Sequence, residues 1–141
     1  MENNKLRLIK VIKVIKVLLL FVFSLLFTLN AFANEADNVN YYCSQIKGNI
    51  EYRLADKTRV DCLTEITAYE FDFAKKFYEA IGQSLYYSIK TNRNAGIYLI
   101  VQDFNDFKYI NRAIVVCSKY NIELIVVEDI VKDIAEDVKK E

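Results

Sequence analysis

The sequence predicts a single α/β domain in which helices flank a mixed β-sheet. Two observations support this prediction. Between residues 50 and 73, apolar and polar side chains alternate with the period of two that is typical of strands. Beyond residue 75, segments with helical period alternate with apolar runs, an order that gives parallel strands joined in the right-handed sense. The 141 residues suffice for one such domain and are too few for two.

The first 33 residues have the features of a secretory signal peptide. Five basic residues precede the apolar segment 17–29, and Ala31-Phe32-Ala33 places small residues at the two positions that signal peptidase recognises. We therefore predict cleavage after Ala33. The mature domain of residues 34–141 would be exported to the periplasm or the extracellular space, without a stable membrane span.

An uncleaved membrane anchor is the alternative fate of this leader. The apolar segment reaches a length that spans a bilayer if residues 11–15 are added to it. Lys13 and Lys16 interrupt the longer segment and argue against an anchor.

Cleavage would change the charge balance of the chain. The full sequence has 19 basic and 19 acidic residues. Residues 1–33 contain five basic residues and one acidic residue, so residues 34–141 retain 14 basic and 18 acidic residues, a net charge of −4. Proteins that grip long nucleic acid through counterion release usually have a basic excess, so the mature composition does not favour that class.

Three cysteines remain in the mature chain: Cys43, Cys62 and Cys117. In an exported protein two of them are expected to pair. Cys117 lies on an apolar stripe with helical spacing, which is typical of a core face, so we predict a disulfide between Cys43 and Cys62. Three reduced, buried thiols are the alternative for a cytoplasmic chain. The absence of histidine and of a Cys-x-x-Cys pair argues against a zinc site.

The amino-terminal half of the domain is predicted to form a short helix and three strands. Residues 35–45 suit a short helix that ends before Gly48. The alternation that follows, with a turn at residues 55–58, predicts an antiparallel meander. Its three strands are residues 50–54, 59–63 and 66–73.

The carboxyl-terminal half is predicted to alternate helices with buried strands. The helix at residues 75–90 has an apolar residue at every fourth position, and this row should face the sheet. The β-branched runs at 97–101 and 122–127 predict two buried strands. The apolar row of the helix at residues 75–90 consists of Phe77, Ile81, Leu85 and Ile89. The other helices are predicted at residues 106–120, with the stripe Phe107, Ile110, Ile114 and Cys117, and at residues 129–140, with Ile130, Val131, Ile134 and Val138.

Carboxylates on two adjacent predicted strands form the candidate site. Glu70 and Asp72 are two residues apart and so project from one face of a strand, and Asp61 on the neighbouring strand can reach the same point. Carboxylate oxygens are ligands for a hard cation such as Mg²⁺, with Mn²⁺ as an alternative. Such a cation activates water and stabilises charge on a phosphate in the transition state. Glu51 is a candidate further ligand, or else a partner of a nearby surface cation.

The helix that follows brings a lysine, a glutamine and a tyrosine to one face. Lys76, Ala80, Gln83 and Tyr87 are separated by four, three and four residues. The small side chain of Ala80 leaves room between Lys76 and Gln83. Lys75 lies on a neighbouring face, where it is expected to pair with an acidic residue in solvent, so Lys76 is favoured as the site lysine.

These residues together resemble the PD-(D/E)XK superfamily of restriction-endonuclease-like proteins. The resemblance covers about residues 41–128. It implies a restriction-endonuclease-like core and magnesium-dependent hydrolysis of phosphodiesters, with nucleic acid as the partner. The segments 51–54 and 59–64 also resemble a set of small, mostly uncharacterised exported bacterial proteins. The residues that carry the superfamily resemblance are Asp61, Tyr69-Glu70-Phe71-Asp72, Lys76 and Ala80-Ile81-Gly82-Gln83-Ser84-Leu85-Tyr86-Tyr87.

The resemblance implies a role for each residue of the site. Asp61 and Glu70 correspond to the metal ligands, Asp72 to a third ligand or a residue that positions water, and Lys76 to the group that stabilises charge. Gln83 corresponds to an orienting residue. The superfamily pattern has lysine two residues after the glutamate, where this chain has Asp72. Lysine on the adjacent helix is a known variant, so Lys76 is expected to replace it.

Three other interpretations stay open. Asp61 and Glu70 could be solvent-facing strand residues paired with Arg59 or Arg53. A catalytically degenerate domain would act as a nuclease-fold binding or inhibitory module in the cell envelope, which the acidic mature chain favours. The aromatic content, 13% of the chain, suits a structural envelope protein with an exposed interaction patch. Metal dependence would separate the enzyme from these last two classes, and a stable complex with a protein partner in the envelope would favour the structural class.

Overall fold

The computed structural model describes residues 2–130, with side chains described for residues 12–22 and 35–130. The chain divides into two units, residues 1–33 and 34–141, and the boundary lies at the predicted cleavage site. Helix α1 (Glu2–Gln45) begins in the first unit and ends in the second. Among the described residues no helix has a stretch both long and apolar enough to cross a membrane. The helix predicted at residues 129–140 lies almost entirely outside the described residues.

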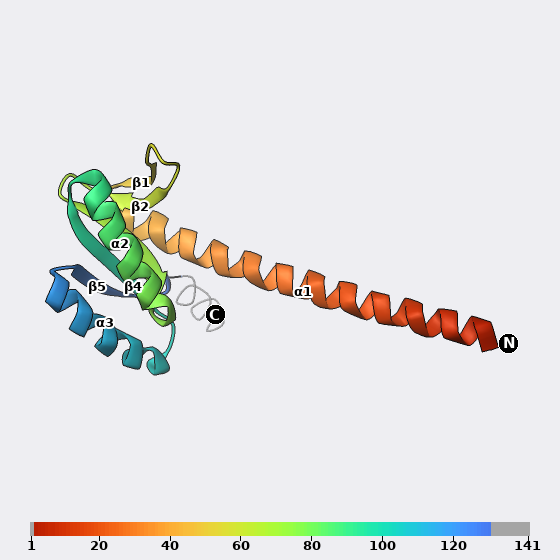
Figure 1. The fold of residues 1–141 in the computed structure, drawn as a ribbon. Coiled ribbons are helices and arrows are strands. Elements are labelled where there is room, and N and C mark those ends of the chain that lie inside the picture. Colours follow the sequence, from red (N-terminus) through yellow and green to blue (C-terminus); the bar gives the residue numbers. More distant parts are fainter. Residues whose placement is uncertain (1, 131–141) are drawn as a thin grey trace, which may run out of the picture. The chain divides into compact units, whose positions relative to one another are not determined.

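The domain of residues 34–141 is built around a mixed sheet with the strand order β1-β2-β3-β4-β5 (Figure 1). The first three strands pair antiparallel, and β4 and β5 continue the sheet in parallel with β3. The predicted meander and the two later parallel strands are therefore confirmed, and with them the α/β class. The strands are β1 (Asn49–Arg53), β2 (Arg59–Leu63), β3 (Thr67–Phe73), β4 (Asn94–Val101) and β5 (Glu123–Glu128). The helical elements after the meander are η1 (Ala74–Lys76), α2 (Phe77–Thr91), η2 (Phe104–Asp106) and α3 (Phe107–Tyr120).

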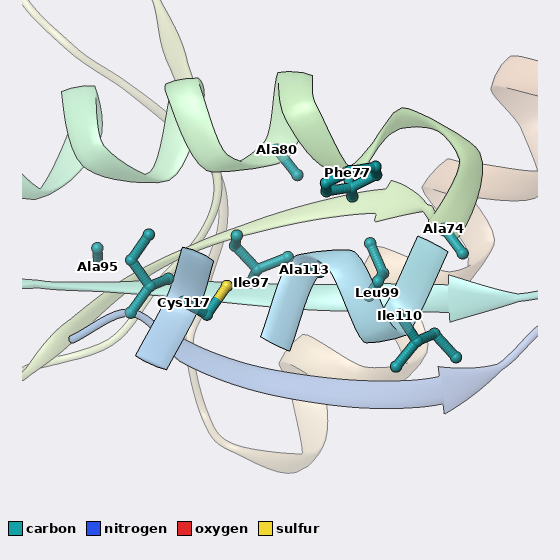
Figure 2. Close-up of a cluster of buried hydrophobic side chains, with 10 residues drawn as sticks. Ala74, Phe77, Ala80, Ala95, Ile97, Leu99, Ile110, Ala113 and Cys117 are labelled. Carbon is teal, nitrogen blue, oxygen red and sulfur yellow. The ribbon is translucent and has the colours of Figure 1, made fainter. Parts of the chain in front are cut away.

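Helices α2 and α3 cover one face of the sheet and the end of α1 covers the other. Because side chains alternate along a strand, Ile97 and Leu99 of β4 point to one face and Tyr98 points to the opposite one. Figure 2 shows the hydrophobic cluster on the first of these faces, in which side chains of α2 and α3 lie over Ile97 and Leu99. On the opposite face, Val39 and Cys43 of α1 pack against Tyr98 and its neighbours Cys62, Tyr69 and Phe71.

The predicted apolar rows of α2 and α3 are only partly correct. In α2, Phe77 is buried, whereas Ile89 is 79% exposed. The buried positions of α2 are Phe77, Ala80, Ser84 and Tyr87. A helix turns about 100° per residue, so a row at every fourth position drifts off the face by about 40° at each step. Alternating steps of three and four keep to the core side.

Helix α3 shows the same error for two residues of its predicted stripe. Ile110 and Cys117 are buried as expected, and Cys117 is a free thiol. Phe107 and Ile114 are 52% and 46% exposed, and Ala113 occupies the core in their place. A small alanine allows the helix to approach the sheet closely, which an apolar row chosen by side-chain size does not reveal.

Strand β4 is buried along most of its length, as predicted, but β5 is not. Its side chains are half-buried or exposed, with Val126 44% exposed. Within the described residues β5 pairs only with β4 and forms the edge of the sheet. An apolar run of β-branched residues therefore identified the strand correctly but not its position in the sheet.

Asparagine ends both helices that follow the meander. Asn92 after α2 and Asn121 after α3 have φ values of 53° and 54°, in the left-handed region. Glycine usually occupies this position, and asparagine is the next most tolerant residue there. The chain has only three glycines and no proline, so asparagine takes over this function.

Candidate functional site

The three predicted carboxylates lie together where β2 and β3 separate. The two strands pair only at Cys62–Tyr69 and Leu63–Ala68. Two residues beyond Tyr69, the Phe71 N–H donates to Oδ2 of Asp61 at 2.9 Å. A side-chain carboxylate thus accepts the bond that a backbone carbonyl would accept in a continuous ladder. This bond fixes Asp61 beside the strand that carries Glu70 and Asp72.

Burial of these carboxylates excludes the interpretation that they are ordinary surface residues. Asp61, Glu70 and Asp72 are 9%, 5% and 4% exposed. Arg59, one of the surface partners considered for them, pairs with Glu51 instead. Glu51 therefore pairs with a surface cation, as one of its two predicted roles implies, but the cation is Arg59 and not the expected Arg53 or Lys57. Charged side chains are rarely this buried without a partner, so the cluster needs a specific explanation.

Glu70 has a buried oxygen without a hydrogen-bond partner among the described residues. The orphaned atom is Oε2. Burial and the neighbouring charges of Asp61 and Asp72 raise the pKa of Glu70 well above its ordinary value. Buried polar atoms in folded proteins are nearly always satisfied, so an orphaned carboxylate oxygen marks a position where a further group could bind.

The pKa values of the other two carboxylates, Asp61 and Asp72, are also raised, each mainly by burial. The pKa of Asp61 is raised to about 7, although its bond from the Phe71 N–H opposes the shift. The pKa of Asp72 is likewise raised to about 7 by burial, against the effect of the nearby Lys76 charge. Oδ1 of Asp72 accepts the Phe73 N–H at 2.9 Å. Several carboxylates thus share a region that disfavours their charged forms, and a cation would reverse that preference.

Lys76 lies at this cluster and Lys75 does not. The Lys76 Nζ is 3.4 Å from Oδ1 of Asp72. The Lys75 Nζ is instead 3.7 Å from Oδ1 of Asp106 and 3.9 Å from Oδ2 of Asp103, at the start of α3. The two consecutive lysines therefore point to different acidic groups, and only Lys76 contacts a predicted site carboxylate.

Gln83 lies beside Tyr87 on α2. It is exposed on α2 and lies within hydrogen-bonding reach of the Tyr87 hydroxyl. Tyr87 is buried, and its pKa is raised by burial and then by the charge of Glu70. Tyr87 is therefore close enough to Glu70 for its charge to act on the hydroxyl group, and Gln83 lies next to that hydroxyl group. The four-three-four spacing on one helix face had placed Tyr87 near the site, but had not distinguished its contribution from ordinary packing.

Glu35 is a member of the cluster that the sequence did not identify. Its Oε2 is 3.7 Å from the Lys76 Nζ, which also contacts Asp72. Its charge also acts on Asp61, Glu70 and Asp72. Burial raises the pKa of Glu35, and the charge of Lys76 opposes that rise. Its position 26 residues before Asp61, in a polar segment, gave no signal of this proximity.

The end of α1 that carries Glu35 is attached to the sheet at several points. The predicted disulfide between Cys43 and Cys62 is present, which confirms that pairing, and Cys62 directly follows Asp61 in β2. The Asn38 Nδ2 donates to Oδ1 of Asp129 at 2.9 Å. The disulfide is typical of oxidising compartments and is compatible with export.

The arrangement is incomplete as a metal centre made of protein ligands alone. Among residues 2–130 no group of three or more histidine, cysteine, aspartate or glutamate side chains has the geometry to hold a metal ion. The donors nearest to such a role are Asp61, with one oxygen bonded to the backbone, and Glu70, with its orphaned oxygen.

Comparison of the chain with protein-family models, with curated proteins and with solved structures found no match.

Proposed function

We propose that the chain is an exported, magnesium-dependent phosphodiester hydrolase of the restriction-endonuclease-like type. The observation that carries this proposal is the orphaned Oε2 of Glu70, buried beside Asp61 and Asp72. A hard cation would give that oxygen a partner and would offset the repulsion among the three carboxylates.

The donors present fit Mg²⁺ or Mn²⁺. Mg²⁺ dehydrates reluctantly and is commonly held by one or two carboxylates, with water completing its shell. Asp61 and Glu70 would serve as the protein ligands, with water completing the shell of the ion. Once bound, such a cation lowers the pKa of water and stabilises negative charge on a phosphoryl group.

The remaining residues would orient and stabilise the substrate. Asp72 would accept a hydrogen bond from the attacking water, because a bound cation would favour its charged form and its charge acts on the ligand Glu70. Lys76 would stabilise charge on the phosphoryl oxygens. Gln83 would orient the substrate at the exposed edge of the site, with Tyr87 between it and the carboxylates.

The fold and the disulfide support the proposal at a coarser level. The order of one helix, a three-stranded antiparallel meander, a helix and a parallel strand is the order that the resemblance implies. Fold alone does not establish chemistry, so the carboxylates carry the argument. The disulfide favours a periplasmic or extracellular site of action, where DNA or RNA would be the substrate class to examine first.

Calorimetry with Mg²⁺ and Mn²⁺ on the oxidised protein tests the proposal. We expect saturable binding that is lost in Glu70→Ala and in Asp61→Asn, together with cation-dependent cleavage of bis(p-nitrophenyl) phosphate or of a labelled oligonucleotide. Glu65→Ala, an exposed carboxylate between β2 and β3, is the matched control. Unchanged cation affinity in Glu70→Ala, with the fold intact by circular dichroism, would contradict the assignment of the site.

A second candidate is a catalytically degenerate binding module, and one observation favours it. Asp72 stands where the superfamily pattern has lysine, and it holds the substitute Lys76 in an ion pair. Cation binding without hydrolysis of any phosphodiester would favour this module. Its partner would then be a protein of the cell envelope.

A further inference from the structure

Lys76 contacts two carboxylates at once. Its ammonium lies 3.4 Å from Oδ1 of Asp72 and 3.7 Å from Oε2 of Glu35. These partners come from different parts of the chain, since Glu35 belongs to α1 and Asp72 to β3. Lys76 is thus a cation held at the edge of a cluster of four carboxylates.

Arg59, the other cation near the cluster, has its ion pair outside it. Arg59 forms an ion pair with Glu51, although its charge also lowers the pKa of Asp61 and Glu70. Deeper in the cluster, Oε2 of Glu70 has no hydrogen-bond partner among the described residues. The Glu70 residue is only 5% exposed. The cluster therefore has one partly exposed counter-ion at its edge and one carboxyl oxygen without a hydrogen-bond partner inside.

We infer that the Lys76 ammonium neutralises Glu35 and Asp72 in the metal-free protein. A divalent cation that binds to the cluster displaces this ammonium. Displacement frees the ammonium to contact a phosphate group of the substrate. Cation binding and phosphate binding are therefore coupled through one side chain. This inference rests on the proposed function, because it takes the cluster to be a cation site.

The position of Lys76 permits such a movement. Its side chain is 51% exposed, so the ammonium can turn into solvent without disturbing the core. The residue ends η1 and precedes α2, whose first side chain, Phe77, is buried and anchors the backbone. Glu35 is fixed more firmly, because the disulfide at Cys43 and the bond from Asn38 to Asp129 hold its helix. The lysine can move while the carboxylates stay.

Cation affinity in charge-matched lysine variants tests the inference on the full, oxidised chain. Lys76→Gln is expected to bind Mg²⁺ roughly three to ten times more tightly than the wild type, because one competing positive charge is removed from a partly exposed site. Lys75→Gln removes the same charge from the contacts with Asp103 and Asp106 and should change the affinity less than about twofold, as expected for a more distant, screened charge. Equal affinities for wild type and Lys76→Gln would overturn the inference and leave the proposed function standing.

Nuclear magnetic resonance of the lysine ammonium groups separates displacement from simple repulsion. In the metal-free chain the Lys76 ammonium should give an observable ¹⁵N–¹H signal, assigned by its loss in Lys76→Gln, because an ion pair slows exchange with water. Saturation with Mg²⁺ should remove or shift this signal, while the Lys75 signal stays unchanged. A Lys76 signal unaffected by saturating Mg²⁺ would overturn the inference even if the affinities differ. Absence of Mg²⁺ binding in the wild type and in both variants would overturn the inference and the proposed function together.

Discussion

Glu70 lowers the stability of the metal-free domain. Its carboxyl group is buried, lacks a hydrogen-bond partner on Oε2 among the described residues, and lies near two other carboxylates. An unsatisfied buried polar group reduces stability by about 1–3 kcal/mol. An apolar residue would occupy the same position without an unsatisfied buried oxygen, so glutamate here is easier to explain by a ligand than by folding.

The pKa shifts of the cluster predict that the metal-free protein loses stability as pH rises. Asp61 and Asp72 have pKa values of about 7 in the folded state, above the ordinary value of about 4 in the unfolded state. Between these values the folded protein binds more protons than the unfolded one, so the free energy of unfolding is highest near pH 4 and decreases toward pH 7. We expect urea titrations in chelator to show a fall of about 1 kcal/mol or more between pH 5 and pH 7. Asp61→Asn should reduce the fall, and an equal fall in this variant would assign the dependence to other groups.

Asp61 has a structural role that two substitutions can separate from its charge. Asp61→Ala removes the acceptor of the buried Phe71 N–H and should lower the free energy of unfolding by about 1–3 kcal/mol. Asp61→Asn retains an oxygen that can accept this bond and removes a buried charge, so it should be at least as stable as the wild type at pH 8. Equal losses in both variants, measured by urea unfolding, would contradict this account of the bond.

At the scale of elements, the end of α1 is held to the sheet where Gly48 meets the disulfide. A Cβ atom at Gly48 would lie 2.7 Å from Sγ of Cys43 and closer still to Sγ of Cys62. Both contacts are too short for any real side chain. Glycine is required here because of space, since none of the glycines has a positive φ. The disulfide, this glycine and the strand that begins at Asn49 therefore form one compact junction.

Two alanine substitutions of glycine should have opposite effects. Gly48→Ala forces the added methyl group against the disulfide and should lower the free energy of unfolding by about 1–3 kcal/mol, the usual effect of overpacking. Gly82→Ala lies in α2, where a Cβ meets nothing within 4 Å, and should raise it by about 0.5–1 kcal/mol because alanine favours helix. The measurement is chemical unfolding of the oxidised protein. A neutral Gly48→Ala would show that the junction can relax.

The sequence predicted the order of the elements better than their faces. The turn at residues 55–58 placed β2 at its observed bounds of Arg59–Leu63, because turn residues mark where the following strand begins. The faces of α2 failed at Ile89, since side-chain hydrophobicity alone does not show where a helix leaves the sheet. The exposure of β5 also could not be predicted, because an apolar run does not distinguish an edge strand from a central one.

The same distinction applies to the candidate site. Asp61, Glu70, Asp72 and Lys76 were found from spacing, because neighbouring strands and the following helix are close in sequence. Glu35 was missed because only the docking of α1 brings it to Lys76. Contacts between distant segments depend on tertiary packing, which local periodicity does not encode.

At the scale of the whole molecule, the two units differ in composition. Residues 1–33 carry five of the 19 basic residues, whereas residues 34–141 contain the carboxylate cluster and the disulfide. A domain with a net charge of −4 would bind a polyanion mainly through local contacts at its site, because it has no general electrostatic attraction for one.

Export with cleavage after Ala33 stays a prediction, and the mass of the exported protein checks it. We expect the protein recovered from the periplasm or the medium to begin at Asn34, because the small residues of Ala31-Phe32-Ala33 suit signal peptidase. Replacement of Ala33 by a bulky residue should leave the leader attached, and this variant is the matched control. Recovery of the intact wild-type chain from the membrane fraction would favour the uncleaved anchor.

The bond between Asp61 and the Phe71 N–H has a consequence for how this sequence can change over time. Asp61 serves both the joint between β2 and β3 and the proposed chemistry, whereas Glu70 makes no bond at Oε2 that folding would miss. A lineage that abandoned catalysis would be free to replace Glu70 and would gain stability by doing so. Selection for folding alone would still retain an acceptor at position 61. Loss of the glutamate with retention of the aspartate is therefore the expected mark of a descendant that has kept the shape and given up the reaction.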